Sequence, residues 1–330
     1  MADLHKEFGT YHEKIALSPG KKDSLRKSRD AIRERIRKHF REKLGAKVPK
    51  FHGQGSFAMI TMVNPLDGEF DIDDGVYLQH LDETVNSDWP TPETVHRWLV
   101  EATDGHTNEK PIDKRTCVRV RYAGQYHVDL PSYARLNGKF MLGEKGDNGW
   151  HPSDSKALTE WFNGYVQTYG EQLRRIVRYL KAWNDHQSKK RGKMPNGLIL
   201  TVLATKNFCP HERDDRALAD TAAAISVAVN PIFCVFNPTD NTEELTSRLS
   251  ELQKERFQDA ISDLASDSSE AVNHISAEKA SEIWREQFGD RFPLIEEEKK
   301  YDEQQQKRQD STSLATVYAA RNPSKPWAYE

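Results

Sequence analysis

Three aspartates stand within four positions of the segment GQGSFAMITMVNPLDGEFDIDDGVYL, residues 53–78. Asp71 and Asp73 are two residues apart, and on a β-strand the side chains of residues i and i+2 point to the same face. Two buried carboxylates side by side are costly unless cations neutralise them, and hard divalent ions such as Mg²⁺ bind carboxylate oxygens well. The spacing therefore predicts a metal site on a strand. Asp74 points to the other face, so we interpret it as a turn or cap residue rather than a ligand.

A second strand pattern carries another acid. The segment TCVRVRYAGQYHVDLPSYA, residues 116–134, alternates apolar and charged residues around an Ala123-Gly124 turn, which predicts a β-hairpin. Its returning arm places Asp129 between two apolar residues. Asp129 would complete the ligation of two ions about 4 Å apart, and it would also suit activation of an attacking hydroxyl.

The pair Gly55-Ser56 precedes the aspartates. Glycine allows close backbone approach, and the Ser56 hydroxyl with nearby N–H groups can hold the terminal oxygens of a triphosphate. A lone Gly-Ser is a common turn, and a lone Asp-x-Asp is often a surface loop or a calcium ligand. The ordered combination with Asp129 favours a site that binds phosphate at one end and metal at the other.

Composition limits the other classes of function. The 330 residues can form two lobes around a cleft, or one domain with long additions. The net charge of −3 gives no global basic signature and no firm indication of nucleic-acid binding. No apolar run approaches the ~20 residues of a membrane-spanning helix, and the first residues have no apolar targeting core. We expect a soluble, cytoplasmic protein with no membrane segment.

The elements that must position these residues follow from periodicity. After a short irregular start, residues 21–45 predict an amphipathic helix whose basic face, with acids interleaved, is read as solvated. Strands follow, and from residue 152 the pattern turns helical, with further helical segments at 196–208, 216–233, 242–265 and 270–288. We expect a leading helix and a catalytic core over residues 1–150, a helical lobe over 151–295 and a mobile tail over 296–330. The apolar stripes are Leu25, Ile32, Ile36, Phe40 and Leu44 in the first helix and Leu173, Ile176, Val177 and Leu180 in the second lobe.

The whole constellation resembles a known family. Residues 53–78 are similar to the Gly-Ser…Asp-x-Asp signature of polymerase-β-like nucleotidyltransferases, in particular of the bacterial cyclic-dinucleotide synthases related to cyclic GMP-AMP synthase, the CD-NTases. KRTCVRVRYAGQYHVDLPSYA resembles the family's strand pair with the third aspartate, and residues 150–187 resemble the helix that begins its second lobe. The resemblance implies an α/β (α+β) fold: a nucleotidyltransferase sheet with flanking helices, a C-terminal helical lobe, and the active site in the cleft between them.

Position by position, the resemblance implies that Gly55 and Ser56 bind the donor triphosphate and that Asp71, Asp73 and Asp129 hold two Mg²⁺ ions, for which Mn²⁺ can substitute. Two further positions match the family: Gln54 precedes the Gly-Ser pair, and Lys181 matches a lysine that contacts donor phosphates. Asn196 departs from the family pattern, because it stands where a serine is often found near those phosphates, but its side chain could still donate a hydrogen bond.

Base recognition has a less direct match. Arg119 aligns with an arginine that can read a guanine edge, and an ordinary cross-strand pair is an equal alternative. Met59 stands where relatives can place an aromatic that stacks on a base.

The resemblance also implies an activity. We expect a Mg²⁺-dependent, template-independent nucleotidyltransferase that joins ATP and GTP into a cyclic dinucleotide, with cyclic GMP-AMP as the first choice, and releases pyrophosphate. Its role would be anti-phage (CBASS-type) signalling, in which the product activates a separate effector. A ubiquitin-activating-like partner could engage the C-terminal tail, or the tail could have no role. The alternatives are a synthase of linear oligonucleotides, such as oligoadenylates, and a catalytically silent nucleotide-binding scaffold.

Overall fold

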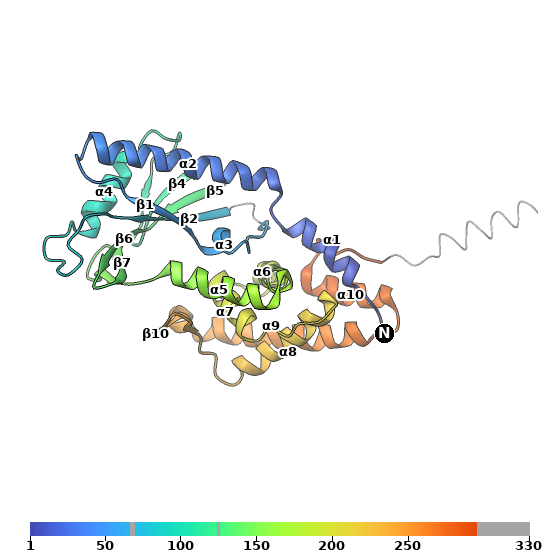
Figure 1. Cartoon of the computed structure of the whole chain (residues 1–330). Coiled ribbons are helices and arrows are strands. Elements are labelled where there is room, and N and C mark those ends of the chain that lie inside the picture. Colours follow the sequence, from blue (N-terminus) through green and yellow to red (C-terminus); the bar gives the residue numbers. More distant parts are fainter. Residues whose placement is uncertain (67–69, 124–125, 296–330) are drawn as a thin grey trace, which may run out of the picture.

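Strand β2 (Phe70–Tyr77) carries the Asp-x-Asp motif at the centre of a mixed sheet. The computed structural model describes residues 1–66, 70–123 and 126–295, and Figure 1 shows this sheet in one lobe and a group of helices in the other. The strand order is β3-β4-β5-β2-β6-β7-β8, with β1 antiparallel to β2. The remaining strands are β1 (Lys50–Gln54), β3 (Ile112–Asp113), β4 (Val118–Tyr122), β5 (Tyr126–Leu130), β6 (Ser132–Leu136), β7 (Lys139–Glu144) and β8 (Gly149–Pro152). The predicted α/β fold with a central sheet and flanking helices is confirmed.

Strands β5 and β6 run parallel to β2 in one continuous register, interrupted at Pro131. The register places Asp73 beside Asp129, because β5 pairs with the first half of β2. Strands β4 and β5 form the predicted antiparallel pair, although residue 124 of the expected Ala123-Gly124 turn lies outside the described residues. The sheet therefore brings together two acids that are more than fifty positions apart in the chain.

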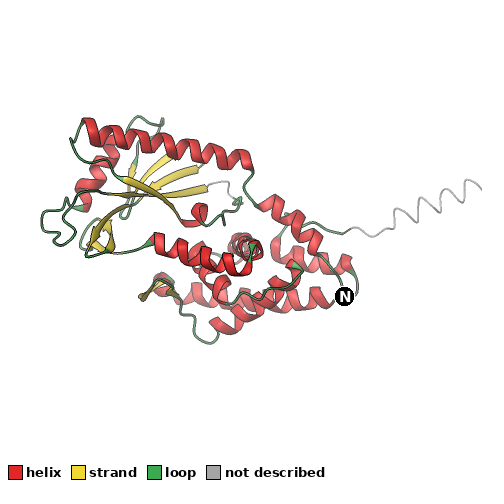
Figure 2. Ribbon diagram, viewed as in Figure 1, coloured by secondary structure: helices red, strands yellow, loops and turns green. Residues whose placement is uncertain are grey.

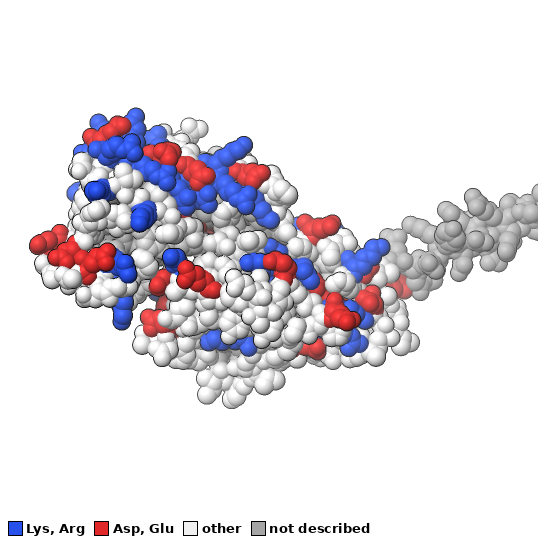
Figure 3. All heavy atoms as spheres, in the orientation of Figure 1, with Lys and Arg blue, Asp and Glu red and all other residues white. Residues whose placement is uncertain are grey.

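Helix α2 (Pro19–Glu42) lies along one face of the sheet and is the predicted amphipathic helix (Figure 2). Ser18 caps it by accepting a hydrogen bond from the Lys21 amide. Its stripe of Leu25, Ile32, Ile36 and Phe40 is buried with helix α4 (Pro92–Thr103) and the inner face of the sheet. Figure 3 shows basic and acidic side chains interleaved on its outer face, as expected of a solvated helix.

Asp74 is neither a turn nor a cap residue, contrary to the expectation from sequence. It lies inside β2, fully buried, where Arg33 of α2 donates to both of its carboxylate oxygens at 2.7 and 2.5 Å. A buried carboxylate is tolerated when a well-placed guanidinium pairs with it. Asp74 therefore attaches α2 to the sheet on the face opposite Asp71 and Asp73.

The start of the chain is not irregular. Helix α1 (His5–Ile15) buries Phe8, Tyr11 and Ile15 in the core of the helical lobe, with Phe8 among Tyr179, Trp284, Phe288 and Phe292. Spacings of three and four residues place the three side chains on one face of a helix. The segment is too short for a stable isolated helix, so its packing against the lobe decides its structure.

The helical lobe is built around α6 (Glu171–Arg191), which is buried along much of its length, including the predicted stripe at Leu173, Ile176, Val177 and Leu180. Gly170, at φ +79°, separates α6 from the preceding helix α5 (Ser155–Tyr169). The expectation of a helix from residue 242 is wrong for its first part, because Asp240–Glu244 is strand β10, paired with β9 (Phe236–Asn237). The helices of the lobe are α5 (Ser155–Tyr169), α6 (Glu171–Arg191), α7 (Gly197–Lys206), α8 (Asp214–Val229), α9 (Glu251–Asn273) and α10 (Ala277–Phe288).

Two further expectations from the sequence concern the C-terminal tail and membrane-spanning helices. The predicted mobile tail, residues 296–330, lies outside the described residues. Within the residues that are described, no helix combines the length and the apolar character needed to span a bilayer.

Candidate active site

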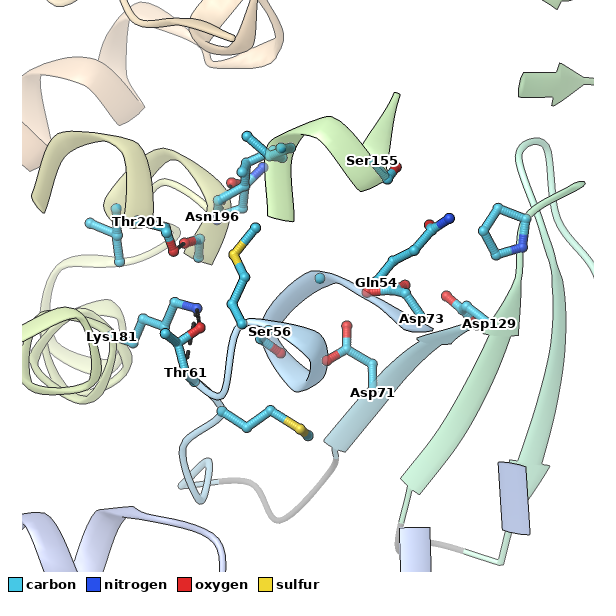
Figure 4. A pocket seen from close by; sticks show the side chains of 18 of the residues that line it. Gln54, Ser56, Thr61, Asp71, Asp73, Asp129, Ser155, Lys181, Asn196 and Thr201 are labelled. Carbon is cyan, nitrogen blue, oxygen red and sulfur yellow. Dashed lines mark hydrogen bonds between the residues drawn. The ribbon is translucent and has the colours of Figure 1, made fainter. Parts of the chain in front are cut away.

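A cavity of about 610 Å³ lies where the sheet and the helical lobe meet. Figure 4 shows side chains from both lobes around it. The sheet lobe contributes Gln54, Gly55, Ser56, Asp71, Asp73 and Asp129, and the helical lobe contributes Lys181, Asn196 and Thr201. Of the predicted site residues, only Arg119 is absent from the lining, and it contacts the site through Asp129.

The aspartates share one face of the sheet, as the spacing predicts. Asp73 lies beside Asp129 in the parallel register, whereas Ile72 is fully buried on the opposite face. Asp71 is exposed at the end of the strand. Burial, followed by the charges of Asp71 and Asp129, raises the pKa of Asp73 to about 7. The cavity floor therefore carries negative charge that the protein itself leaves partly uncompensated.

Arg119 forms the cross-strand pair that was the alternative to guanine recognition. It lies opposite Asp129 in the β4–β5 register and donates to both carboxylate oxygens at 2.6 and 2.7 Å. This hydrogen bond is the main cause that raises the pKa of Arg119. The pair holds Asp129 in a fixed orientation and directs both of its oxygens to the guanidinium.

The donor set suits a hard divalent ion, but the carboxylates do not converge on one point. Across residues 1–66, 70–123 and 126–295, no three or more histidine, cysteine, aspartate or glutamate side chains are arranged to hold a metal ion. The raised pKa of Asp73 and the all-oxygen chemistry of the acids fit Mg²⁺. Asp129 could join as a ligand by turning one oxygen away from Arg119.

Gly55 allows the Gly-Ser turn to rest on the face of the sheet that carries Asp73. Its φ is +60°, and a Cβ at this position would overlap the Oδ2 atom of Asp73. Only glycine satisfies both requirements without strain. The turn forms the short helix α3 (Gly55–Ala58), and Ser56 follows Gly55 into the cavity wall (Figure 4).

Gln54 is fully engaged inside the sheet lobe. Its side-chain NH₂ donates to the Tyr77 hydroxyl at 2.9 Å, and its carbonyl oxygen accepts from Tyr133 at 3.2 Å. With an exposed fraction of 3 %, its side chain supports the turn from beneath. Tyr133 also contacts Ser155 of α5 at 2.9 Å, so this network reaches the second lobe.

Lys181 of α6 extends into the cavity from the helical lobe. Its ammonium donates to the Thr61 hydroxyl at 3.0 Å, the contact drawn as a dashed line in Figure 4. Burial lowers the pKa of Lys181 to about 8, and the charge of Asp71 opposes that shift. Asn196 caps α7, its side-chain oxygen accepting from the amides of Leu198 and Ile199.

The residues after the turn join the cores of both lobes. Met59 has an exposed fraction of 2 % and packs in the core of the helical lobe, while its surface also lines the cavity. Met62 packs in the core of the sheet lobe. Thr61 lies between them, fully buried.

Several lining residues were not anticipated from sequence, among them Thr61, Tyr133, Ser155 and Thr201. Hydroxyl residues are common in turns and helices, so their type alone gives no signal. Tyr133 carries a weak signal in the sequence, because it lies close to the predicted site residue Asp129: four positions after it and two positions after Pro131.

The nucleotidyltransferase motif matches a family model. Residues 49–133 match "Cyclic GMP-AMP synthase DncV-like, nucleotidyltransferase domain". The cyclic GMP-AMP synthase of Escherichia albertii is 28% identical over 249 residues, which cover 73% of this chain and 55% of that protein. The cyclic GMP-AMP synthase of Vibrio cholerae is 25% identical over 221 residues, which cover 51% of this chain and 49% of that protein. The chain thus spans about half the length of the curated relatives it matches.

Solved structures agree on the fold. Vibrio cholerae DncV cyclic AMP-GMP synthase in complex with nonhydrolyzable GTP superposes with a TM-score of 0.75 at 20% identity, covering 90% of this chain and 100% of that chain. Escherichia coli DncV in its 3'-deoxy GTP bound form gives a TM-score of 0.71 at 21% identity, covering 88% of this chain and 97% of that chain. In its Asp-x-Asp strand, the third aspartate beside it and the Gly-Ser turn against Asp73, the chain is therefore similar to the DncV-like cyclic GMP-AMP synthases, and residues 49–133 match their nucleotidyltransferase domain.

Proposed function

We propose that this protein is a divalent-metal-dependent nucleotidyltransferase that joins two nucleoside triphosphates, without a template, into a cyclic dinucleotide and releases pyrophosphate. The observation that carries the proposal is the contact between the Gly55 turn and Asp73, with Asp129 alongside, at the floor of a cavity between two lobes. The groups proposed to bind phosphate and metal thereby lie next to one another. Transfer of a nucleotidyl group requires both at the same phosphorus.

In this proposal, the aspartates bind the metal, and the other site residues bind the phosphates of the donor nucleotide. Asp71, Asp73 and Asp129 would hold Mg²⁺, with Mn²⁺ able to substitute. The bound metal supplies positive charge that neutralises the reacting phosphate. The Ser56 hydroxyl would bind the terminal phosphates, and the Lys181 ammonium would leave Thr61 to pair with them. Asn196 would offer its amide NH₂, since its oxygen is engaged in capping α7.

In the first transfer, the ribose hydroxyl oxygen of the acceptor forms a bond to the donor's α-phosphorus. The bond from that phosphorus to the leaving pyrophosphate oxygen breaks. Asp129 accepts the hydroxyl proton after turning one oxygen from Arg119, which keeps the carboxylate oriented. Repetition of the same transfer between the two ends of the linear intermediate closes the ring.

Cyclic GMP-AMP made from ATP and GTP is the product we propose. The curated relatives are named cyclic GMP-AMP synthases, and one DncV structure contains the linear intermediate 5' pppA(3',5')pG. In this proposal, the protein works in the cytoplasm in anti-phage signalling, where the product activates an effector. The C-terminal tail is the segment that a ubiquitin-activating-like partner would engage.

Product analysis tests the activity. The protein is incubated with all four triphosphates and Mg²⁺ or Mn²⁺, pyrophosphate release is followed, and the product is identified by mass spectrometry after phosphatase treatment. A cyclic product resists phosphatase because it has no terminal phosphate, whereas a linear oligonucleotide loses its terminal phosphates. Chelation of the metal, or Asp71→Ala with Asp73→Ala, should abolish release. Nucleotide binding without any pyrophosphate release would instead favour the silent scaffold.

A further inference from the structure

Three basic side chains of α6 hold three successive carbonyls of the segment that follows the Gly-Ser turn. Arg174 donates to the Met59 carbonyl at 3.0 Å, Arg178 donates to the Ile60 carbonyl, and Lys181 reaches the Thr61 carbonyl at 3.4 Å. Positions i, i+4 and i+7 lie on one face of a helix. We call Arg174, Arg178 and Lys181 the carbonyl clamp.

The clamped segment has an unusual backbone. The Ile60 amide donates to the Phe57 carbonyl at 3.2 Å, and the Thr61 amide donates to the Ser56 carbonyl at 2.8 Å. This pair of bonds is the Schellman ending of a helix, in which the left-handed residue is usually glycine. Here it is Ile60, at φ +58°. A β-branched residue disfavours this conformation, so surrounding contacts must hold it.

The side chain of Ile60 gives little of that support. It has an exposed fraction of 47 %, although its neighbours Met59 and Thr61 are buried. Arg178, by contrast, is buried, and its other terminal nitrogen donates to His12 of α1 at 2.7 Å. Burial, followed by the charge of Arg178, lowers the pKa of His12 to about 4, so the imidazole is neutral and can accept this bond.

We propose that Arg178, assisted by Arg174, is a positioning residue that keeps the phosphate-binding turn in its strained, active conformation. The connection is direct, because the Thr61 amide bonds the carbonyl of Ser56, and Ser56 is the residue assigned to the triphosphate. The clamp also allows Lys181 to move. When the ammonium leaves Thr61 for phosphate, Arg174 and Arg178 still hold the two preceding carbonyls.

The effect on pyrophosphate release rests on the proposed function, whereas the effect on amide exchange in the turn does not. The structural arm measures amide hydrogen exchange of Thr61 in the protein without nucleotide. Arg178→Gln should accelerate this exchange at least tenfold. Arg175→Gln is the matched control, because Arg175 is the adjacent arginine of α6 but pairs with buried Asp214 instead of the turn. Equal Thr61 protection in Arg178→Gln and wild type would overturn the inference, whether or not the protein is active.

The kinetic arm follows pyrophosphate release. Arg178→Gln should lower kcat/KM about 10- to 100-fold, because a displacement near 1 Å at a reacting group has effects of this size. Arg178→Lys should retain more activity, since its ammonium can still reach one carbonyl. Arg175→Gln should lose far less than Arg178→Gln.

Ile60→Gly separates positioning from direct contact with the nucleotide. Glycine adopts φ +58° without strain, so the turn no longer needs the arginine. In the Arg178→Gln background, Ile60→Gly should restore kcat/KM at least tenfold, and in the wild-type background it should change kcat/KM by less than about threefold. Failure of this rescue would show that Arg178 acts on the nucleotide itself and would overturn the proposal. If the wild type released no pyrophosphate, the proposed function would fail, and exchange at Thr61 would still decide whether the clamp exists.

Discussion

The left-handed conformation of Gly55 places the backbone of the Gly-Ser turn against the carboxylate of Asp73. Two separate constraints act on this one residue, a positive φ and the absence of space for a Cβ. Asp73 in turn carries a raised pKa because it is buried near two other acids. The chemistry of the site thus depends on a backbone position as much as on its carboxylates.

Gly55→Ala should therefore be more harmful than an alanine substitution normally is. We expect the free energy of unfolding to fall by roughly 1–2 kcal/mol from the backbone conformation alone, and kcat/KM to fall by about 100-fold as the turn shifts from Asp73. Denaturant unfolding and pyrophosphate release measure the two effects. Gly53→Ala is the control, because a Cβ there meets nothing within 4 Å. Equal behaviour of the two variants would contradict the assigned role of Gly55.

Lys181 should make nucleotide binding sensitive to pH. Burial lowers its pKa to about 8 in the free protein, so the ammonium is present below pH 8 and is lost above it. Affinity for a nonhydrolysable ATP analogue should therefore fall as the pH rises above 8, by up to about tenfold per pH unit. Titration calorimetry between pH 7 and 9.5 measures this. Lys181→Arg stays charged and should flatten the profile; an unchanged decline in that variant would exclude Lys181 as its cause.

At the scale of elements, the sheet carries carboxylates on both of its faces, for different purposes. On one face, Asp71, Asp73 and Asp129 face the cavity; on the other, Asp74 pairs with Arg33 and attaches α2. The side chain of Asp74 is 1 % exposed and that of Arg33 is 16 % exposed. A single strand therefore carries both a candidate metal site and a structural ion pair in adjacent positions.

Asp74→Asn should destabilise the protein without abolishing nucleotide binding. Removing one partner of a buried pair leaves the other charge without compensation, and we expect a loss of roughly 3 kcal/mol in the free energy of unfolding. Asp30→Asn removes an exposed partner of the same arginine, at 3.7 Å, and should cost less than about 1 kcal/mol. Urea unfolding compares the variants. A loss of affinity for nucleotide in folded Asp74→Asn would indicate that this residue acts in the site after all.

The parts of the site that follow from strand periodicity could be predicted from the sequence. Asp71, Asp73 and Asp129 depend on a two-residue repeat and a hairpin, which are local patterns. Lys181 could be assigned only by resemblance, because its burial results from contact between lobes. The role of Asp74 was misjudged because its partner, Arg33, is distant in the chain. The strand at Asp240–Glu244 was missed for another reason, because it pairs with only two residues, Phe236–Asn237, in a short hairpin of largely exposed residues.

In the whole molecule, the N-terminal segment connects the two lobes. Helix α1 packs in the helical lobe and α2 packs on the sheet, with residues 16–18 between them. Nothing in the first fifteen residues indicated this from sequence beyond the spacing of Phe8, Tyr11 and Ile15. Helix α1 also reaches the carbonyl clamp through His12, so the start of the chain supports the site from behind.

Phe8→Ala should therefore weaken the helical lobe substantially. The ring is fully buried and contacts four other aromatic rings, so its removal should lower the free energy of unfolding by about 3–5 kcal/mol. Phe8→Leu should cost clearly less, because it fills much of the same volume. Thermal and denaturant unfolding provide the measurement. A cost below about 1 kcal/mol for Phe8→Ala would mean that α1 is dispensable for the lobe.

The short path from Met59 to Met62 limits how the length of the chain can vary. Met59 is anchored in one core and Met62 in the other, and each carbonyl between them has its own partner on α6. One inserted residue would displace every partner by one position and would turn a buried side chain toward solvent. Substitutions that preserve backbone geometry can therefore be accommodated here, whereas insertions and deletions cannot. A scan of single-residue insertions should find residues 82–88, in the exposed loop after β2, permissive and residues 59–62 intolerant.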